Sequence, residues 1–185
     1  RLNSGGTILQ PQEIRVALYH GAFASLLSRL NDNTEWRTLY GRKSTRLKDI
    51  ELILRFLGLY FHSGSYKRPM KAFLNRYMAS NHDLSKQAEN VIIPIFENTV
   101  STILSGIGKS AFRPFSGAIN VAVLESVMYG VAARLATGPI KETVALKTAY
   151  DALLVSDSYK NAVSSGTANE ESVTARLSAA KAAFA

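Results

Sequence analysis

The chain has 185 residues, of which 46% are hydrophobic and 19% are charged, a composition that excludes a disordered polypeptide. It contains no cysteine, which excludes disulfides and thiolate metal sites, and its histidines His20, His62 and His82 lack the spacing of metal ligands. No uninterrupted apolar run is long enough to span a bilayer, so we expect a cytoplasmic protein with no membrane partner.

The excess positive charge lies in the N-terminal part of the chain. The net charge is +8, and residues 1–80 carry thirteen Lys and Arg against five Asp and Glu, whereas residues 81–185 carry nine of each. Such an asymmetry is typical of a surface that faces a polyanion such as DNA, or an acidic partner protein.

Helical periodicity begins at Pro11, a residue suited to the first turn of a helix. An apolar stripe predicts one helix that continues to about Leu30, and its members are Ile14, Leu18, Ala22, Leu26 and Leu30. Thr34 is expected to cap a short helix that contains Trp36 and Leu39.

Residues 46–61, RLKDIELILRFLGLYF, predict a central buried helix, because they leave almost no polar face for water. Thr45 is expected to cap this helix. Only Glu51 and Arg55 interrupt the buried run, and their i,i+4 spacing with the acid first favours an ion pair. The pair is either purely structural or a fixed charge that lines a polar groove.

The remaining chain predicts further helices and no strand. They are expected over residues 69–78, 84–104, 118–135, 140–154 and 157–163, with Asn169 as the cap of a last helix. Pro94 is expected to begin, kink or interrupt the second of them. Because no stretch alternates convincingly with a period of two residues, the predicted fold is all-α, a single compact multi-helix domain over residues 11–185.

One phosphate-binding motif is only partly present. Ser105 to Ser110 reads SGIGKS and ends like a P-loop, but Ile103 stands where the pattern needs its first glycine. A helix is also predicted before the loop, where a P-loop needs a strand. We therefore interpret these residues as the end of a helix followed by a turn.

Two clusters of basic residues flank the central helix. Arg42, Lys43 and Arg46 precede it, and Lys67, Arg68 and Lys71 follow it. They predict either a patch for a nucleic-acid backbone or a solvated surface. No helix-turn-helix or zinc-finger pattern accompanies them, so reading of bases is not supported. No signature of a nucleophile with its base appears either, so no catalytic residue is assigned.

Two stretches together resemble a known family. Residues 1–15 read RLNSGGTILQPQEIR, and residues 46–56 read RLKDIELILRF. They closely resemble the motifs RLN-x-GG-x-x-L-x-x-QE-[IL]-R and R-[ML]-x-D-x-E-x-x-LRF of the GmrSD-type family. Looser matches follow in the family's order at residues 73–78, 108–113 and 172–176, so the resemblance spans most of the chain.

The resemblance implies a two-part protein in which a ParB/sulfiredoxin-like, nucleotide-hydrolysing domain precedes a helical domain. Residues 1–10 would then be the tail end, or remnant, of that α/β domain, and residues 11–185 the helical domain. The residues expected to border the nucleotide site are Arg1, Asn3, Gly5 and Gly6. The residues expected to hold the junction between the two parts are Gln12, Glu13, Arg15, Asp49, Glu51 and Arg55.

Family members resemble NTP-dependent nucleases that act in bacterial defence against phage DNA, including modified DNA, often with an HNH nuclease domain. Their nucleotide chemistry is attributed to an Asp-Gly-Gln-Gln-Arg motif that this sequence does not contain. We therefore expect no cofactor in this chain, and NTP and Mg²⁺ in the full-length protein. The expected partners are DNA, the nucleotide-hydrolysing domain, a nuclease domain or subunit, and further copies of the chain.

Two functions follow for the helical part. It supports nucleotide-regulated DNA recognition or cleavage as part of a modification-dependent restriction protein, without a complete active site of its own. Alternatively, it is a protein–protein interaction module whose basic N-terminal half docks an acidic partner or nuclease domain.

Overall fold

The computed structural model describes residues 8–115, 117–140 and 142–185, and within these ranges the regular structure is entirely helical. The predicted all-α fold is therefore confirmed. The helices are α1 (Pro11–Leu18), α2 (Ala22–Leu30), α3 (Thr34–Tyr40), α4 (Lys48–His62), the 3-10 turn η1 (Ser63–Ser65), α5 (Met70–Ser80), α6 (Glu89–Gly106), α7 (Val121–Leu135), α8 (Thr143–Val155), α9 (Asp157–Ser164) and α10 (Glu170–Ala183). None of these helices is long and apolar enough to cross a membrane.

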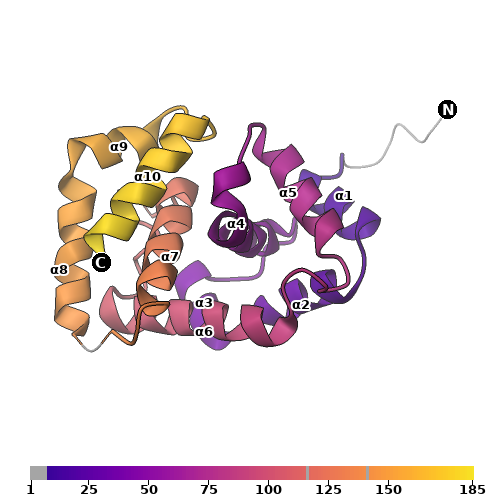
Figure 1. The fold of residues 1–185 in the computed structure, drawn as a ribbon, viewed down its shortest axis with the longest axis horizontal. Coiled ribbons are helices and arrows are strands. Elements are labelled where there is room, and N and C mark those ends of the chain that lie inside the picture. Colours follow the sequence, from indigo (N-terminus) through magenta and orange to yellow (C-terminus); the bar gives the residue numbers. More distant parts are fainter. Residues whose placement is uncertain (1–7, 116, 141) are drawn as a thin grey trace.

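Two long helices, α4 and α6, contact both the N-terminal and the C-terminal half of the molecule (Figure 1). Helix α4 lies at the centre and contacts α1, α2 and α5 on one side and α7 on the other. Helix α6 runs along one edge of both halves, where it contacts α2, α3, α7 and α8. The C-terminal helices α7 to α10 form the second half of the molecule.

The predicted central helix is buried, as expected. Ile53, Leu54, Phe56, Leu57 and Leu59 of α4 are all fully enclosed, which accounts for its nearly continuous apolar sequence. A side chain of this size contributes about 1.5–3 kcal/mol to folding when it is fully buried. The polar loop before α4 is held to the helix start, since Ser44 Oγ accepts hydrogen bonds from the amides of Arg46 and Lys48.

The prediction that Thr45 caps α4 is wrong. The residue before the helix is Leu47, which takes the left-handed conformation with φ 55° and makes no side-chain cap. Thr34 is likewise not a cap but the first residue of α3, and Asn33 caps that helix by accepting hydrogen bonds from the amides of Glu35 and Trp36. The short amide side chain of Asn33 reaches the free amides of the first turn, which explains the shift by one residue.

The single helix predicted from Pro11 to Leu30 is in fact two. Helix α1 ends at Leu18 and α2 begins at Ala22. Between them, the backbone of Gly21 is extended, and a Cβ at this position would come within 2.8 Å of the carbonyl oxygen of His82. The amide of Phe23 donates a hydrogen bond to the same carbonyl at 3.0 Å. Tertiary packing against the loop after α5 therefore overrides the helical periodicity.

Helix α6 begins later than predicted, at Glu89, and runs without a break through Pro94. Leu84 has φ 64°, and the side chain of buried Asn81 accepts hydrogen bonds from the amides of Lys86 and Gln87. These hydrogen bonds hold residues 81–87 in a loop. A helix that started at residue 84 could not form them. The helix ends at Gly106 in the turn predicted there, where the amides of Ile107 and Gly108 both donate to Ile103.

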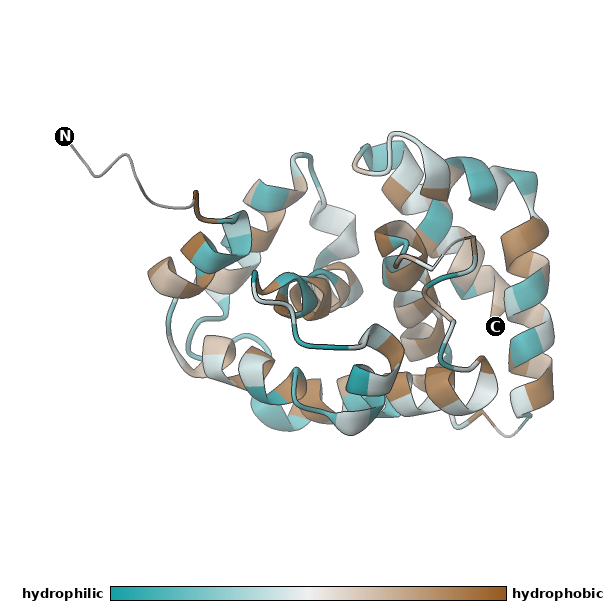
Figure 2. Ribbon diagram, turned by 180° about the vertical axis from the view of Figure 1, so that it is seen from behind, coloured by the Kyte–Doolittle hydropathy of each residue, from teal (hydrophilic) through white to brown (hydrophobic). Residues whose placement is uncertain are grey.

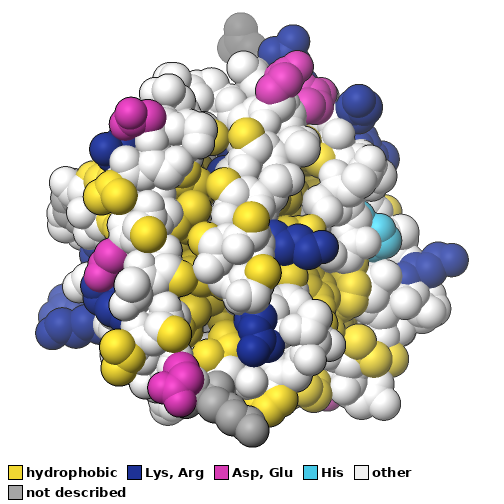
Figure 3. All heavy atoms as spheres, turned by 60° about the vertical axis from the view of Figure 1, so that its left-hand side comes forward, with side chains coloured by type: hydrophobic (Ala, Val, Ile, Leu, Met, Phe, Trp, Pro, Cys, Tyr) yellow, Lys and Arg dark blue, Asp and Glu magenta, His cyan; other side chains and the backbone are white. Residues whose placement is uncertain are grey.

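The C-terminal half is built on a close contact between α7 and α10. Gly130 of α7 faces the backbone of α10, and a Cβ there would approach the carbonyl oxygen of Ala180 to 2.7 Å and the ring of Phe184 to 2.8 Å. Val173, Leu177, Ala180 and Phe184 are buried, as the periodicity of residues 170–184 predicts. Figure 3 shows the face of this half of the molecule, on which hydrophobic side chains lie among polar ones.

Replacing Gly130 by alanine is expected to destabilise the fold by about 1–3 kcal/mol, because the new methyl group overpacks the α7–α10 contact. Helix propensity alone would stabilise the variant by about 1 kcal/mol. The sign of the change in the free energy of unfolding therefore distinguishes overpacking from helix propensity. Urea unfolding measures it, with Gly64→Ala as the control, since a Cβ at Gly64 meets no atom within 4 Å. A Gly130→Ala protein as stable as the parent would contradict this packing.

Candidate functional site

Helix α1 is turned with its polar side chains inward. Gln12 and Arg15 are each only 1% exposed, whereas Ile14 and Leu18 are 36% and 67% exposed. The predicted apolar stripe is therefore wrong for Ile14 and Leu18 of α1 and for the exposed Ala22, and it holds only for Leu26 and Leu30 of α2. Figure 2 shows hydrophobic residues of α1 at the outer edge of the molecule, next to the grey N-terminal trace.

Arg15 explains this orientation. Its Nε donates to Asn75 Oδ1 of α5 at 2.9 Å, and its Nη1 donates to Gln12 Oε1 and lies 3.4 Å from Glu51 Oε2 of α4. These partners satisfy a guanidinium that is removed from water. The start of the helix is held by Glu13, whose carboxylate accepts the amide of Gln10 at 2.6 Å, a capping-box interaction.

The ion pairs continue from α1 across the molecule. Glu51 Oε1 accepts the Nε and Nη2 of Arg55 at 3.1 and 3.0 Å, as predicted for the i,i+4 pair. Arg55 Nη1 donates to Glu125 Oε1 of α7 at 2.9 Å, and Glu125 Oε2 accepts Arg176 of α10. We call these five residues, Arg15, Glu51, Arg55, Glu125 and Arg176, the charge ladder.

The charge ladder alternates in sign and carries three cations against two anions. Burial lowers the pKa of Arg55, but Glu125 and Glu51 outweigh it and raise that pKa overall. Burial lowers the pKa of Arg15, and Glu51 offsets this only in part. At the α1 end of the ladder, the cost of removing the Arg15 guanidinium from water is therefore offset only in part.

Asp49 does not join the charge ladder, although the same motif supplies it. Its Oδ2 accepts hydrogen bonds from Asn31, Arg37 and the amide of Ser44 at 2.9–3.1 Å, and Asn31 in turn accepts the indole Nε1 of Trp36 at 2.9 Å. Residues two positions apart on a helix face different directions. Asp49 therefore binds α2 and α3, whereas Glu51 points to α1.

A pocket of about 440 Å³ adjoins the charge ladder, between α1, α4 and the start of α7. Glu51 and Arg55 line it, so the pair is a structural ion pair that also borders a cavity. The other lining residues are Gln10, Pro11, Gln12, Tyr40, Arg46, Lys48, Leu52, Ile119 and Val121.

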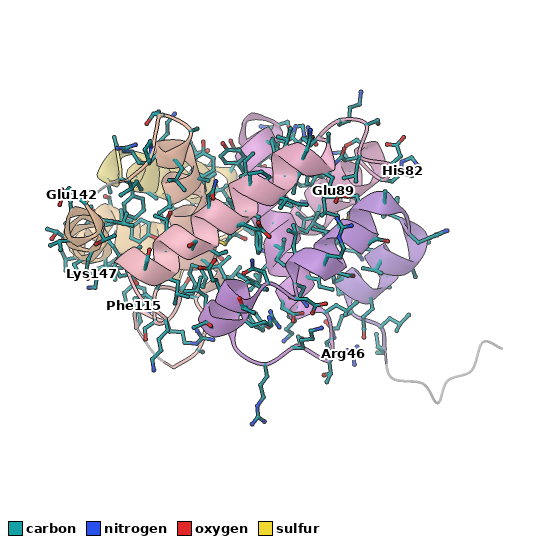
Figure 4. All side chains as sticks on the ribbon, turned by 90° about the horizontal axis from the view of Figure 1, so that it is seen from below. Arg46, His82, Glu89, Phe115, Glu142 and Lys147 are labelled. Carbon is teal, nitrogen blue, oxygen red and sulfur yellow. The ribbon has the colours of Figure 1, made fainter. Side chains whose placement is uncertain are left out.

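Arg46 lines this pocket and does not point freely into solvent. Its Nη2 is 3.0 Å from Glu13 Oε2 and donates to the carbonyl of Ile8. Figure 4 places its label close to where the described chain begins. Of the same loop, Lys43 is paired with Asp32 at the surface, and Arg42 is exposed with no ion pair among the described residues.

The second basic cluster lies at the other end of α4, about 22 Å away by the length of that helix. Lys67 and Lys71 are exposed. Arg68 is tied to α10, because its amide donates to Glu170 at 3.0 Å and its guanidinium to Asn169 at 3.2 Å. The two predicted clusters are therefore not one continuous patch.

The residues expected to border the nucleotide site lie outside the described residues; they are Arg1, Asn3, Gly5 and Gly6. Within those residues, no group of three or more His, Asp or Glu side chains is placed to hold a metal ion. Ser105 and Gly106 belong to α6, so the SGIGKS segment follows a helix and lacks the strand of a P-loop.

Sequence reasoning missed three members of the site. Asn75 and Arg176 stand in the loosely matched segments 73–78 and 172–176, and Glu125 interrupts the apolar run of residues 118–135. Asn75 accepts a hydrogen bond from Arg15, and Glu125 accepts hydrogen bonds from Arg55 and Arg176. The sequence could have indicated Glu125, because a single acidic residue in an otherwise apolar, buried helix needs a charged partner.

No family model, no curated protein and no solved structure matches the chain.

Replacing Glu125 by glutamine is expected to destabilise the protein by about 3–5 kcal/mol, because it removes the carboxylate between two arginines while leaving them buried. Glu125 and Arg176 are each 1% exposed. Chemical denaturation provides the measurement. The control is Asp151→Asn in the half-exposed Lys147–Asp151 pair, which is expected to cost less than about 1 kcal/mol. Equal effects of the two substitutions would contradict a central role for Glu125.

Proposed function

We propose that the chain is the helical, non-catalytic part of a bacterial anti-phage defence protein of the GmrSD type, in which it supports nucleotide-regulated recognition or cleavage of DNA. Its own task is to dock the nucleotide-hydrolysing domain on α1 and to present the basic N-terminal half to DNA. In this proposal NTP and Mg²⁺ bind elsewhere in the full-length protein, and a nuclease domain or subunit supplies the cleavage.

The outward apolar face of α1 carries this proposal. A helix on the surface of a globular domain normally buries its apolar stripe. Here Leu18 and Ile14 face water, and Ile8 and Leu9 just before the helix are 87% and 58% exposed. An apolar face of this kind at the predicted junction is typical of a surface that another domain covers.

The assembly of the motifs gives further support. The first two family-like motifs are about 30 residues apart in sequence, yet they contact each other through Arg15 with Glu51 and through Glu13 with Arg46. Asn75 and Arg176, from two of the looser matches, bind the same network. Polar residues from four separate segments therefore meet in one buried network, and this network supports the proposal because it fixes α1 with its apolar face outward.

The coding sequence upstream of Arg1 offers a direct test of the family proposal. An Asp-Gly-Gln-Gln-Arg motif in that region would support it. A different upstream domain without this motif would overturn it and favour an unrelated interaction module.

In the full-length protein, Leu18→Asp is expected to weaken the contact between the nucleotide-hydrolysing domain and the helical domain about tenfold, because it places a charge in an apolar interface. Binding of the two separately expressed parts, measured by calorimetry, and protection against phage are both expected to fall. Val155→Asp is the matched control, since Val155 is 69% exposed against 67% for Leu18 and lies on α8, at the far end of the molecule. Equal losses from both substitutions would contradict docking on α1.

DNA binding by the 185-residue chain is expected to fall steeply as salt rises, because binding to phosphates releases counterions. Arg42→Glu with Lys67→Glu is expected to reduce the slope of log K against log salt by about 0.9 for each phosphate that the variant no longer neutralises. Arg46 is unsuited to this test because it is paired with Glu13.

The control for the DNA experiment is Lys160→Glu with Lys181→Glu, the same charge change in the neutral half of the chain. Fluorescence anisotropy over 50–300 mM salt is the measurement, a range of about sixfold in which such slopes are resolved. Absence of binding at the lowest salt would overturn the DNA role. The basic residues would then favour the alternative function, docking of an acidic partner.

A further inference from the structure

The pocket beside the charge ladder is lined by more cations than anions. Arg46, Lys48 and Arg55 line it, and Glu51 is its one acidic residue among the described parts of the chain. Glu51 is already bound by Arg55 and Arg15, so its charge is compensated. Lys48 is exposed and forms no ion pair within the described ranges. Arg46 is paired with Glu13, and Arg55 with Glu51 and Glu125. The positive charge that the cavity offers to a ligand is therefore that of Lys48.

Helix starts add to this positive potential. Lys48 and Val121, which line the pocket, are the first residues of α4 and α7. Each of these helices has 15 residues, so each brings the positive end of a substantial dipole to the cavity. Pro11, the first residue of α1, lines the same pocket. Three helix N-termini thus converge on one volume.

Two buried donors at the pocket have no acceptor. Nε2 of Gln12 and Nε of Arg46 are enclosed and make no hydrogen bond to the described residues. Gln12 is 1% exposed, and its Oε1 is already occupied by Arg15, so only the amide nitrogen is free to bind. Buried donors without acceptors are rare in folded proteins, and these two lie on residues that line the same cavity.

The rest of the lining is apolar. Pro11, Tyr40, Leu52, Ile119 and Val121 supply it, and the volume of about 440 Å³ lies in the range of pockets for small organic ligands. A bare inorganic ion would leave this apolar part of the cavity empty. A ligand that combines an oxyanion with a compact apolar body would match both parts.

We propose that this pocket binds a small organic oxyanion, a phosphate or a carboxylate that carries an apolar or aromatic group. The oxyanion lies near Lys48, the Arg46 Nε and the Gln12 Nε2, and the apolar group packs against Tyr40, Ile119 and Val121. The inference stands on the geometry of the cavity and is independent of the docking and DNA roles proposed above.

Phenyl phosphate and benzoate are suitable probes, since they share the ring and differ in the anionic group. Titration of the ¹⁵N-labelled 185-residue chain is expected to give saturable shifts at the Gln12 side-chain amide and at the backbone amide of Val121. The tighter of the two probes identifies the natural ligand as a phosphate or as a carboxylate. Absence of saturable shifts with both probes at millimolar concentration would overturn the proposal.

Lys48→Gln is the variant of choice, because Lys48 is exposed and its loss does not disturb the core. The dissociation constant of the tighter probe is expected to rise about tenfold, as for the loss of one charge-assisted hydrogen bond. Lys67→Gln is the control, another exposed lysine near the other end of α4, and is expected to bind normally. Equal weakening by both variants would mean unspecific attraction and would overturn the site.

Leu18→Asp separates this inference from the docking role. Leu18 does not line the pocket, so the variant is expected to bind the probe as the parent does, even where docking is abolished. Loss of probe binding in this variant would show that the shifts report on the outer face of α1, and it would overturn the pocket as the site.

Discussion

The buried carboxylate of Glu125 constrains the whole fold. A charge removed from water is tolerated only when opposite charges and hydrogen bonds replace the solvent. Glu125 obtains these from Arg55 of α4 and Arg176 of α10, and Arg55 then requires Glu51, which also faces Arg15 of α1. The need to compensate one buried carboxylate thereby fixes α1, α4, α7 and α10 relative to one another.

This arrangement gives the fold specificity more than raw stability. Apolar contacts around α4 supply the main driving force, and they tolerate small rotations of the packed helices. Paired charges tolerate much less, because a rotation that breaks one pair leaves the other member unsatisfied. The short helix α1 shows the effect, since Arg15 and Gln12 set its orientation even though Ile14 and Leu18 then remain in water.

The helices were predictable where burial follows periodicity. The apolar run of residues 46–61 and the spacing of Val173, Leu177 and Ala180 indicate α4 and α10 correctly, because both helices bury a wide apolar surface. The break at Gly21 was not predictable, since it depends on the carbonyl of His82, 61 positions away. The same holds for the inward face of α1, whose partners Glu51 and Asn75 come from two other helices. Local pattern identifies a helix, but contacts distant in sequence decide which of its faces is buried.

The contact of α7 with α10 has a consequence for synthesis of the chain. Residues 170–183 leave the ribosome after every other helix that the structure describes. Until then Arg176 is absent, Glu125 has only Arg55 as a cationic partner, and the groove at Gly130 that receives Ala180 is open. Domains often fold as units during translation, and here α1 to α9 form an incomplete unit with an exposed groove. The surface of α7 that α10 covers therefore stays exposed to water until the last described helix has been synthesised.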